Sequence, residues 1–219
     1  MARARIQPIH TGHYTMPADG PFANERIVVT AFLVEHPKGL FLFDTGFSPE
    51  PKKLVDRFRP VYMRPIDEAL RAAGRSIADI AAIANCHFHP DHAGGNHHFA
   101  GVPIFVQKAE VEHARSDAEY TYLAEPWPGI RIIPTQGHSP GHQSLVVETA
   151  QGRVILAGQA LNFSSDYARH RYSHELARAG EPHGPYPDWI ATFYKLDPAR
   201  VYFAHDRAAW ERSVESEIR

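Results

Sequence analysis

Three histidines and one aspartate fall within six positions of the stretch Asn85-Cys86-His87-Phe88-His89-Pro90-Asp91-His92-Ala93-Gly94-Gly95. An apolar run at 80–84 precedes them and is typical of a short buried strand. Residues two apart at the end of a strand point the same way, so we expect His87 and His89 to converge on one ion. Pro90 suits the first position of a helix, which places Asp91 and His92 in its opening turn. Imidazoles with one carboxylate suit zinc or another divalent first-row metal, so the stretch predicts a metal site in preference to a solvated histidine-rich turn.

The composition is that of a globular protein with a sizeable core, with 219 residues of which 43% are hydrophobic. We predict a single domain spanning residues 1–219. A formal net charge of −2 without a basic stripe argues against a nucleic-acid partner. The longest apolar stretch, 27–34, is too short to span a bilayer, so no membrane partner is expected. Cys86 is the single cysteine and fits a reducing compartment, so we expect a cytoplasmic protein whose oligomeric state the sequence leaves open.

The pattern of apolar runs predicts clusters of strands separated by helices. Residues 1–26 are expected to be irregular, because glycines and prolines interrupt them. Strands are predicted at 27–34, 40–43, 80–84, 102–106, 130–133, 144–147, 154–157 and 201–204. Helices are predicted at 49–58, 66–73, 108–114, 164–179 and 189–196. This order favours two sheets with helices packed outside.

Two further histidines lie where a backbone can present them to the same ions. His138 is in a loop bounded by Gly137 and Gly141, and His205 follows the last predicted strand. One ion would take His87, His89 and His138, and a second would take Asp91, His92 and His205. Each ion then has three protein ligands and an open position, and two such ions about 3.5–4 Å apart can share a hydroxide.

These segments together resemble the metallo-β-lactamase superfamily, and within it the N-acyl-homoserine lactonase branch. The resemblance is carried by residues 87–96 (HFHPDHAGGN), 103–110 (PIFVQKAE), 137–145 (GHSPGHQSL) and 43–46 (FDTG), and by the late pair His205-Asp206. It implies a four-layer αββα sandwich with a dinuclear site at one sheet edge. It also implies a metal-dependent hydrolase whose substrate is a small-molecule ester or lactone, with N-acyl-homoserine lactones (quorum quenching) as one candidate.

The chain departs from the family pattern at two positions. Where the family has a bridging aspartate, this chain has Gln159, which offers a carbonyl oxygen but no charge and is expected to be a weak or absent ligand. Loss of an anion between two cations weakens at least one site, so we expect one firmly bound zinc and a weaker second one. The tyrosine of the lactonase branch, three residues later, is replaced by Asn162, with Tyr167 near it in sequence.

The predicted chemistry is metal-assisted hydrolysis, with Asp91 orienting the attacking hydroxide and carrying its proton to the leaving group. A thioesterase of the hydroxyacylglutathione type and a β-lactam hydrolase share the same core and stay open as alternatives. A metal-binding protein with decayed catalysis is a third, because of Gln159.

Several residues near these motifs have expected supporting roles. Asp44 is expected to orient a ligand histidine. Cys86 is expected to point away from the ligands and pack in the core. The segment 163–188 is either a solvated helix and loop or a lid over the site. Candidates for an acyl pocket are Met16, Phe47, Tyr62 and Met63.

Overall fold

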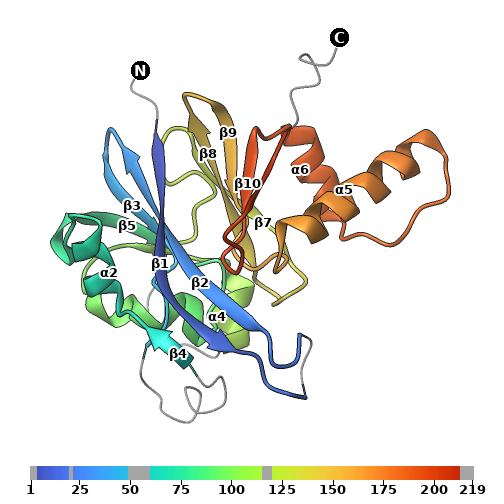
Figure 1. The fold of residues 1–219 in the computed structure, drawn as a ribbon. Coiled ribbons are helices and arrows are strands. Elements are labelled where there is room, and N and C mark those ends of the chain that lie inside the picture. Colours follow the sequence, from blue (N-terminus) through green and yellow to red (C-terminus); the bar gives the residue numbers. More distant parts are fainter. Residues whose placement is uncertain (1–3, 20–21, 49–59, 115–119, 213–219) are drawn as a thin grey trace.

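The computed structural model describes residues 4–19, 22–48, 60–114 and 120–212. Two β-sheets lie face to face, with helices on their outer sides (Figure 1). The six-stranded sheet has the order β4 (Pro60–Met63), β1 (Arg5–Thr15), β2 (Arg26–His36), β3 (Gly39–Phe43), β5 (Ile80–Ala84) and β6 (Ile104–Phe105). The five-stranded sheet has the order β11 (Ala209–Glu211), β10 (Arg200–Tyr202), β9 (Gly152–Leu156), β8 (Gln143–Thr149) and β7 (Ile130–Pro134).

Three apolar clusters hold these layers together. The central one lies between the sheets and includes Phe41 and Phe43 of β3 and Leu145 of β8. A second cluster packs α2 (Ile66–Ala72) on the outer side of the six-stranded sheet. A third packs α5 (Ser164–Ala179) and α6 (Trp189–Leu196) on the five-stranded sheet. The predicted αββα sandwich is therefore confirmed.

The expectation that residues 1–26 are irregular is wrong. Residues 5–15 form β1, which pairs with β2 along its whole length. Gly12 lies at a register shift in this pairing instead of breaking the strand, and a Cβ there would lie 2.6 Å from the Tyr62 carbonyl oxygen. A bulge of this kind interrupts the alternation of apolar residues, which hid the strand. The helix predicted at 49–58 lies outside the described residues.

The strands that precede the sequence motifs all end at one edge of the sandwich. Strands β3, β5 and β6 are parallel, as are β9 and β10. Strand β7 runs with β9 because both are antiparallel to β8. The segments that follow the ends of these strands therefore meet at this edge. They are Asp44, residues 85–92, residues 135–142, Gln159 and His205. In the part of the chain that the structure describes, every helix is too short or too polar to cross a bilayer.

Candidate metal centre

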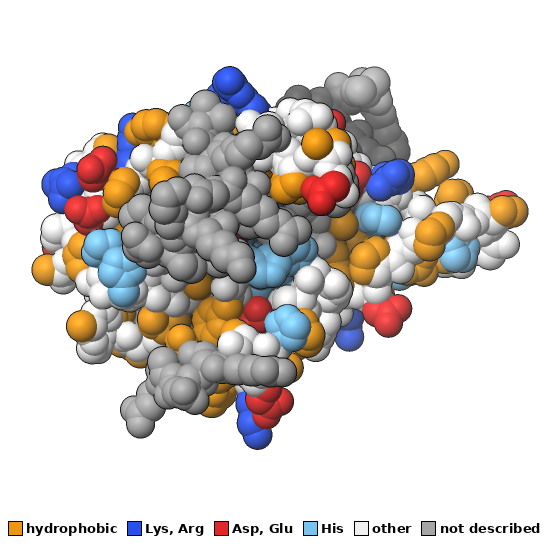
Figure 2. Space-filling view, turned by 90° about the horizontal axis from the view of Figure 1, so that it is seen from below, with side chains coloured by type: hydrophobic (Ala, Val, Ile, Leu, Met, Phe, Trp, Pro, Cys, Tyr) orange, Lys and Arg blue, Asp and Glu red, His pale blue; other side chains and the backbone are white. Residues whose placement is uncertain are grey.

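The first predicted ligand group, His87, His89 and His138, converges at this edge. The ring of His87 lies 4.4 Å from that of His89 and 4.6 Å from that of His138, between centroids. His89 Nδ1 lies 3.1 Å from His138 Nε2. One nitrogen from each residue falls within 4.8 Å of the others. Figure 2, which views the molecule from below Figure 1, shows histidine side chains near the middle of that face.

The second predicted group, Asp91, His92 and His205, lies directly beside the first. His92 Nε2 is 3.3 Å from His205 Nε2 and 3.5 Å from Asp91 Oδ2. The rings of His87 and His92 are 4.4 Å apart, so the two groups are contiguous. Gln159 also reaches this group, since its Oε1 lies 3.2 Å from His92 Nε2. All seven side chains named from the sequence are thus brought together.

Buried hydrogen-bond acceptors orient the histidines of the second group. His92 Nδ1 lies 2.9 Å from Asp44 Oδ2, and His205 Nδ1 donates to the Val28 carbonyl oxygen over 2.7 Å. Donation from Nδ1 leaves the Nε2 lone pair of each ring directed at the cluster. The expected role of Asp44 as the partner of a ligand histidine matches this contact.

Glu110, which the sequence analysis left without a role, ties the two histidine loops together. Its buried carboxylate accepts the Phe88 amide at Oε1 and the Ser139 hydroxyl and Gly141 amide at Oε2, over 2.7–3.1 Å. The first bond fixes the loop that carries His87 and His89, and the others fix the loop that carries His138. A Cβ at Gly141 would lie 2.1 Å from the Glu110 amide nitrogen, so this close approach requires glycine.

The expectation that Cys86 points away from the ligands is wrong. Its Sγ donates to Asp44 Oδ2 over 3.1 Å and lies 3.1 Å from His87 Nδ1 and 3.3 Å from His92 Nδ1. Strand β5 ends at Ala84, so the alternation of a strand no longer applies at residue 86. Burial, with Asp44 adding to it, raises the pKa of the Cys86 thiol to about 12. The thiol therefore stays protonated and lies beneath the histidines as a buried donor.

Tyr14 of β1 is a residue of the site that the sequence analysis missed. Its buried hydroxyl donates to Asp91 Oδ2 over 3.3 Å, and its ring meets that of His205 edge-on. No motif marks it, because the strand that places it was not recognised. Tyr167, by contrast, packs against Phe193 and Phe203 behind the five-stranded sheet. It therefore does not replace the family tyrosine.

The electrostatics of the cluster favour neutral imidazoles at His87 and His205 beside an ionised Asp91. Burial, reinforced by neighbouring histidines, lowers the pKa of His87 well below its usual range. Burial lowers the pKa of His205 to about 4, and His92 adds to this effect. For Asp91, burial alone would raise the pKa, but the charges of His92 and His205 lower it. For His92, burial alone would lower the pKa, but Cys86, Asp91 and Asp44 raise it well above its usual range, so this ring gives up a proton when it binds a metal. Neutral histidines with an ionised aspartate are the protonation states that bind a divalent metal.

The geometry of the histidine and aspartate side chains fits a metal ion. His87 Nε2 is buried and has no hydrogen-bond partner among the described residues. A buried polar atom left unpaired costs about 1–3 kcal/mol, and a metal bond would remove that cost. The nitrogen-rich group and the adjoining group with one carboxylate both match the ligand preference of zinc.

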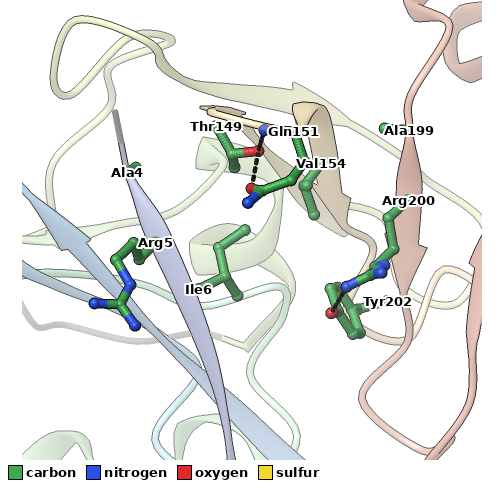
Figure 3. Close-up of a pocket in the computed structure, with 9 residues that line it drawn as sticks. All are labelled: Ala4, Arg5, Ile6, Thr149, Gln151, Val154, Ala199, Arg200 and Tyr202. Atoms are coloured by element: carbon green, nitrogen blue, oxygen red, sulfur yellow. Dashed lines mark hydrogen bonds between the residues drawn. The ribbon is translucent and has the colours of Figure 1, made fainter. Parts of the chain in front are cut away.

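A cavity of about 370 Å³ lies at the opposite edge of the sheets (Figure 3). Its lining comes from the starts of β1 and β10 and from the turn between β8 and β9, and includes Arg5, Gln151 and Arg200. Arg200 there bonds to Glu211 and to the Tyr202 hydroxyl. The histidine clusters lie outside this cavity, so the chemistry belongs to the other edge.

Comparison with known proteins decides the family. The sequence model of the metallo-beta-lactamase superfamily matches residues 25–122. The N-acyl homoserine lactonase of Bacillus cereus is 30% identical over an alignment of 180 residues that covers 71% of this chain and 70% of that protein. This chain belongs to the metallo-beta-lactamase superfamily. The lactonase AttM of Rhizobium radiobacter is 23% identical over an alignment of 227 residues that covers 87% of this chain and 86% of that protein.

Solved structures agree with this membership. A quorum-quenching N-acyl homoserine lactone lactonase superposes with a TM-score of 0.65 at 29% identity, over 94% of each chain. AidC, a dizinc quorum-quenching lactonase, superposes with a TM-score of 0.68 over 99% of this chain and 93% of that one, at 15% identity, which supports the fold alone. As a member of the metallo-beta-lactamase superfamily, the chain is a metal-dependent hydrolase, and its histidine clusters are the candidate metal-binding residues.

Proposed function

We propose that this hydrolase opens lactone rings, with N-acyl-homoserine lactones as its substrates, using zinc held at the clustered histidines. The observation that carries the proposal is the convergence of six ligand side chains from separate segments into two adjoining groups. Relatives that act on N-acyl homoserine lactones, at about 30% identity, support the substrate class.

The firmly bound zinc would be held by His87, His89 and His138, whose three nitrogens carry no charge. A second zinc would be held by Asp91, His92 and His205 and would bind more weakly, because Gln159 supplies only an amide oxygen. The amide is oriented for this contact, since its Nε2 donates to Asn162 Oδ1 over 3.2 Å while its Oε1 faces His92. Other divalent first-row metals suit the same donors.

A zinc ion bound by three protein ligands supplies a water of lowered pKa and polarises a carbonyl oxygen. Asp91 would orient the nucleophile and carry its proton to the leaving oxygen, as the general base and acid. Tyr14 donates to Asp91 Oδ2 and so fixes the carboxylate for both steps. We propose that Tyr14 supplies the phenol that the family has at the position of Asn162.

An apolar cluster beside Tyr14 suits the acyl chain of such a substrate. The buried members of this cluster are Tyr14, Ile27, Val29 and Phe47. The partly buried residues packed against it are Met16, Met63 and Phe163. Three of the four residues predicted for an acyl pocket are in this group. The fourth, Tyr62, stacks instead on His10 and His13.

The test compares ring opening of N-hexanoyl-homoserine lactone with hydrolysis of a thioester and a β-lactam by zinc-loaded protein. We expect the lactone to be preferred, and His89→Ala to abolish hydrolysis while the protein stays folded. His97→Ala, at an exposed histidine outside both groups, is the matched control and should keep full activity. Preference for the thioester or β-lactam would refute the substrate class, and unchanged turnover in His89→Ala would refute the site. Absence of all three activities with zinc bound would favour decayed catalysis.

A further inference from the structure

A cavity next to the metal centre lies between the β1–β2 hairpin and the loop that follows β10. It measures about 420 Å³ and is lined by His13, Arg26, Val28, His205, Asp206 and Arg207. His13 and Val28 are register partners in β1 and β2, whereas Tyr14 and Ile27, the next pair, turn into the apolar cluster of the active site. His205 is common to both places, since its Nε2 faces the ligand cluster and its Nδ1 bonds to the Val28 carbonyl oxygen.

The charges that line this cavity are mostly positive and lack counterions. Among the described residues, Arg26 and Arg207 form no ion pair, and both are exposed. The one carboxylate, Asp206, is committed elsewhere. Its Oδ2 accepts the Ser164 amide and hydroxyl, and its Oδ1 accepts the Ala208 amide. It forms no ion pair with either arginine, and with two guanidinium groups against one carboxylate the cavity lining keeps a net positive charge.

More cationic and donor groups lie immediately beside the cavity. The rings of His10, His13 and Tyr62 stack on one another with centroids 5.8–6.1 Å apart, and Arg64 bonds to the Tyr62 hydroxyl. His10 Nε2 and His13 Nδ1 are buried without a hydrogen-bond partner among the described residues. Burial lowers the pKa of His10, and the positive charges of Arg207, His13 and Arg64 add to that effect. The two arginines of the cavity thus lie beside buried imidazole nitrogens that no described residue binds.

We propose that this cavity is an oxyanion-binding site for a small carboxylate or phosphate. Guanidinium groups pair with both by two parallel hydrogen bonds, and the volume lies in the range of about 300–1,000 Å³ usual for small-ligand sites. An anion bound there lies against the back of His205, next to the hydrolytic centre. Two sources carry this chemistry. One is a free anion, and the other is the carboxylate that hydrolysis of an ester or lactone creates.

The test is calorimetric titration of zinc-loaded protein with inorganic phosphate and, separately, with ring-opened N-hexanoyl-homoserine. We expect both to bind, and the double variant Arg26→Ala, Arg207→Ala to weaken each at least tenfold. The control is Arg169→Ala, Arg178→Ala, two exposed arginines of α5, which should bind as the native protein does. His89→Ala distinguishes anion binding in the cavity from anion binding at the metal. We expect binding in the cavity to be unchanged in this variant.

Each result decides the proposal. Binding of phosphate alone assigns the site to free anions, and binding of both assigns it to the product carboxylate as well. Loss of binding in His89→Ala with no change in the double arginine variant would place the anion on the metal and overturn the proposal, as would the absence of any binding. Lactone turnover is not part of this readout, so failure of the proposed substrate leaves the test intact.

Discussion

Gln159→Asp restores the carboxylate that the family has between its two ions and should tighten the second zinc. Gln159 Oε1 already lies 3.2 Å from His92 Nε2. A negative charge there attracts a dication about 4 Å away by roughly 8 kcal/mol at an effective dielectric constant of 20. Dehydration of the half-buried carboxylate costs several kcal/mol of this. We expect a net gain of about 3 kcal/mol, which is roughly a hundredfold in the dissociation constant.

The assay is competition for zinc against a chromogenic chelator, which resolves the two dissociation constants. The tighter constant should stay unchanged, because His87, His89 and His138 are untouched. Gln159→Glu keeps the length of the side chain and separates the effect of charge from that of reach. Gln151→Asp makes the same change at the opposite edge of the sheets and should alter neither constant. If the weaker constant of Gln159→Asp equals that of the native protein, the assigned role of residue 159 is wrong.

Three further changes test other parts of the site. Tyr14→Phe should lower kcat for lactone opening about tenfold to hundredfold, which is the contribution of one hydrogen bond to a charged group. Tyr167→Phe, outside the site, is the control, and equal losses in both variants would contradict a specific role for Tyr14. Asp44→Asn should weaken zinc binding about 10–100-fold at the group that contains His92, as measured by the same competition assay. Equal weakening at both zinc sites would indicate general unfolding. In zinc-free protein, the pKa of His205 is about 4 when folded, so the unfolded chain takes up its proton first as the pH falls below 6.5. The free energy of unfolding in urea should therefore fall by about 1.4 kcal/mol from pH 8 to pH 5.5 on account of this residue. His205→Gln should remove this fall, and an equal fall in the variant would contradict the assignment to His205.

Much of the site could be predicted because its ligands sit in short motifs at strand ends. The close spacing of His87 and His89 just after β5 predicted that they share a site, although the strand itself ends at Ala84, and the parallel strands brought His138 and His205 to the same edge. The motifs are short, so the local sequence alone identifies the ligand residues. The apolar pattern of the central strands likewise predicts the strands that carry them. The four-layer sandwich follows from the same alternation of strand clusters and helices.

The residues that were missed depend on contacts between distant segments. Tyr14 reaches Asp91 from β1, which stays paired with β2 beyond the register shift at Gly12, whereas a glycine in isolation signals a break. Glu110 joins two loops through a carboxylate that accepts two backbone amides and one serine hydroxyl, and backbone amides have no sequence signature. Cys86 turned toward the ligands because the strand ends two residues before it. In each case tertiary packing, not local pattern, sets the role.

Anomalous diffraction at the zinc absorption edge, from crystals of protein loaded with excess zinc, tests the central claim most directly. We predict one fully occupied peak among His87, His89 and His138, and an adjoining peak of lower occupancy among Asp91, His92 and His205. Peaks outside these six side chains, or none at the edge where they meet, would contradict the assignment of the metal centre.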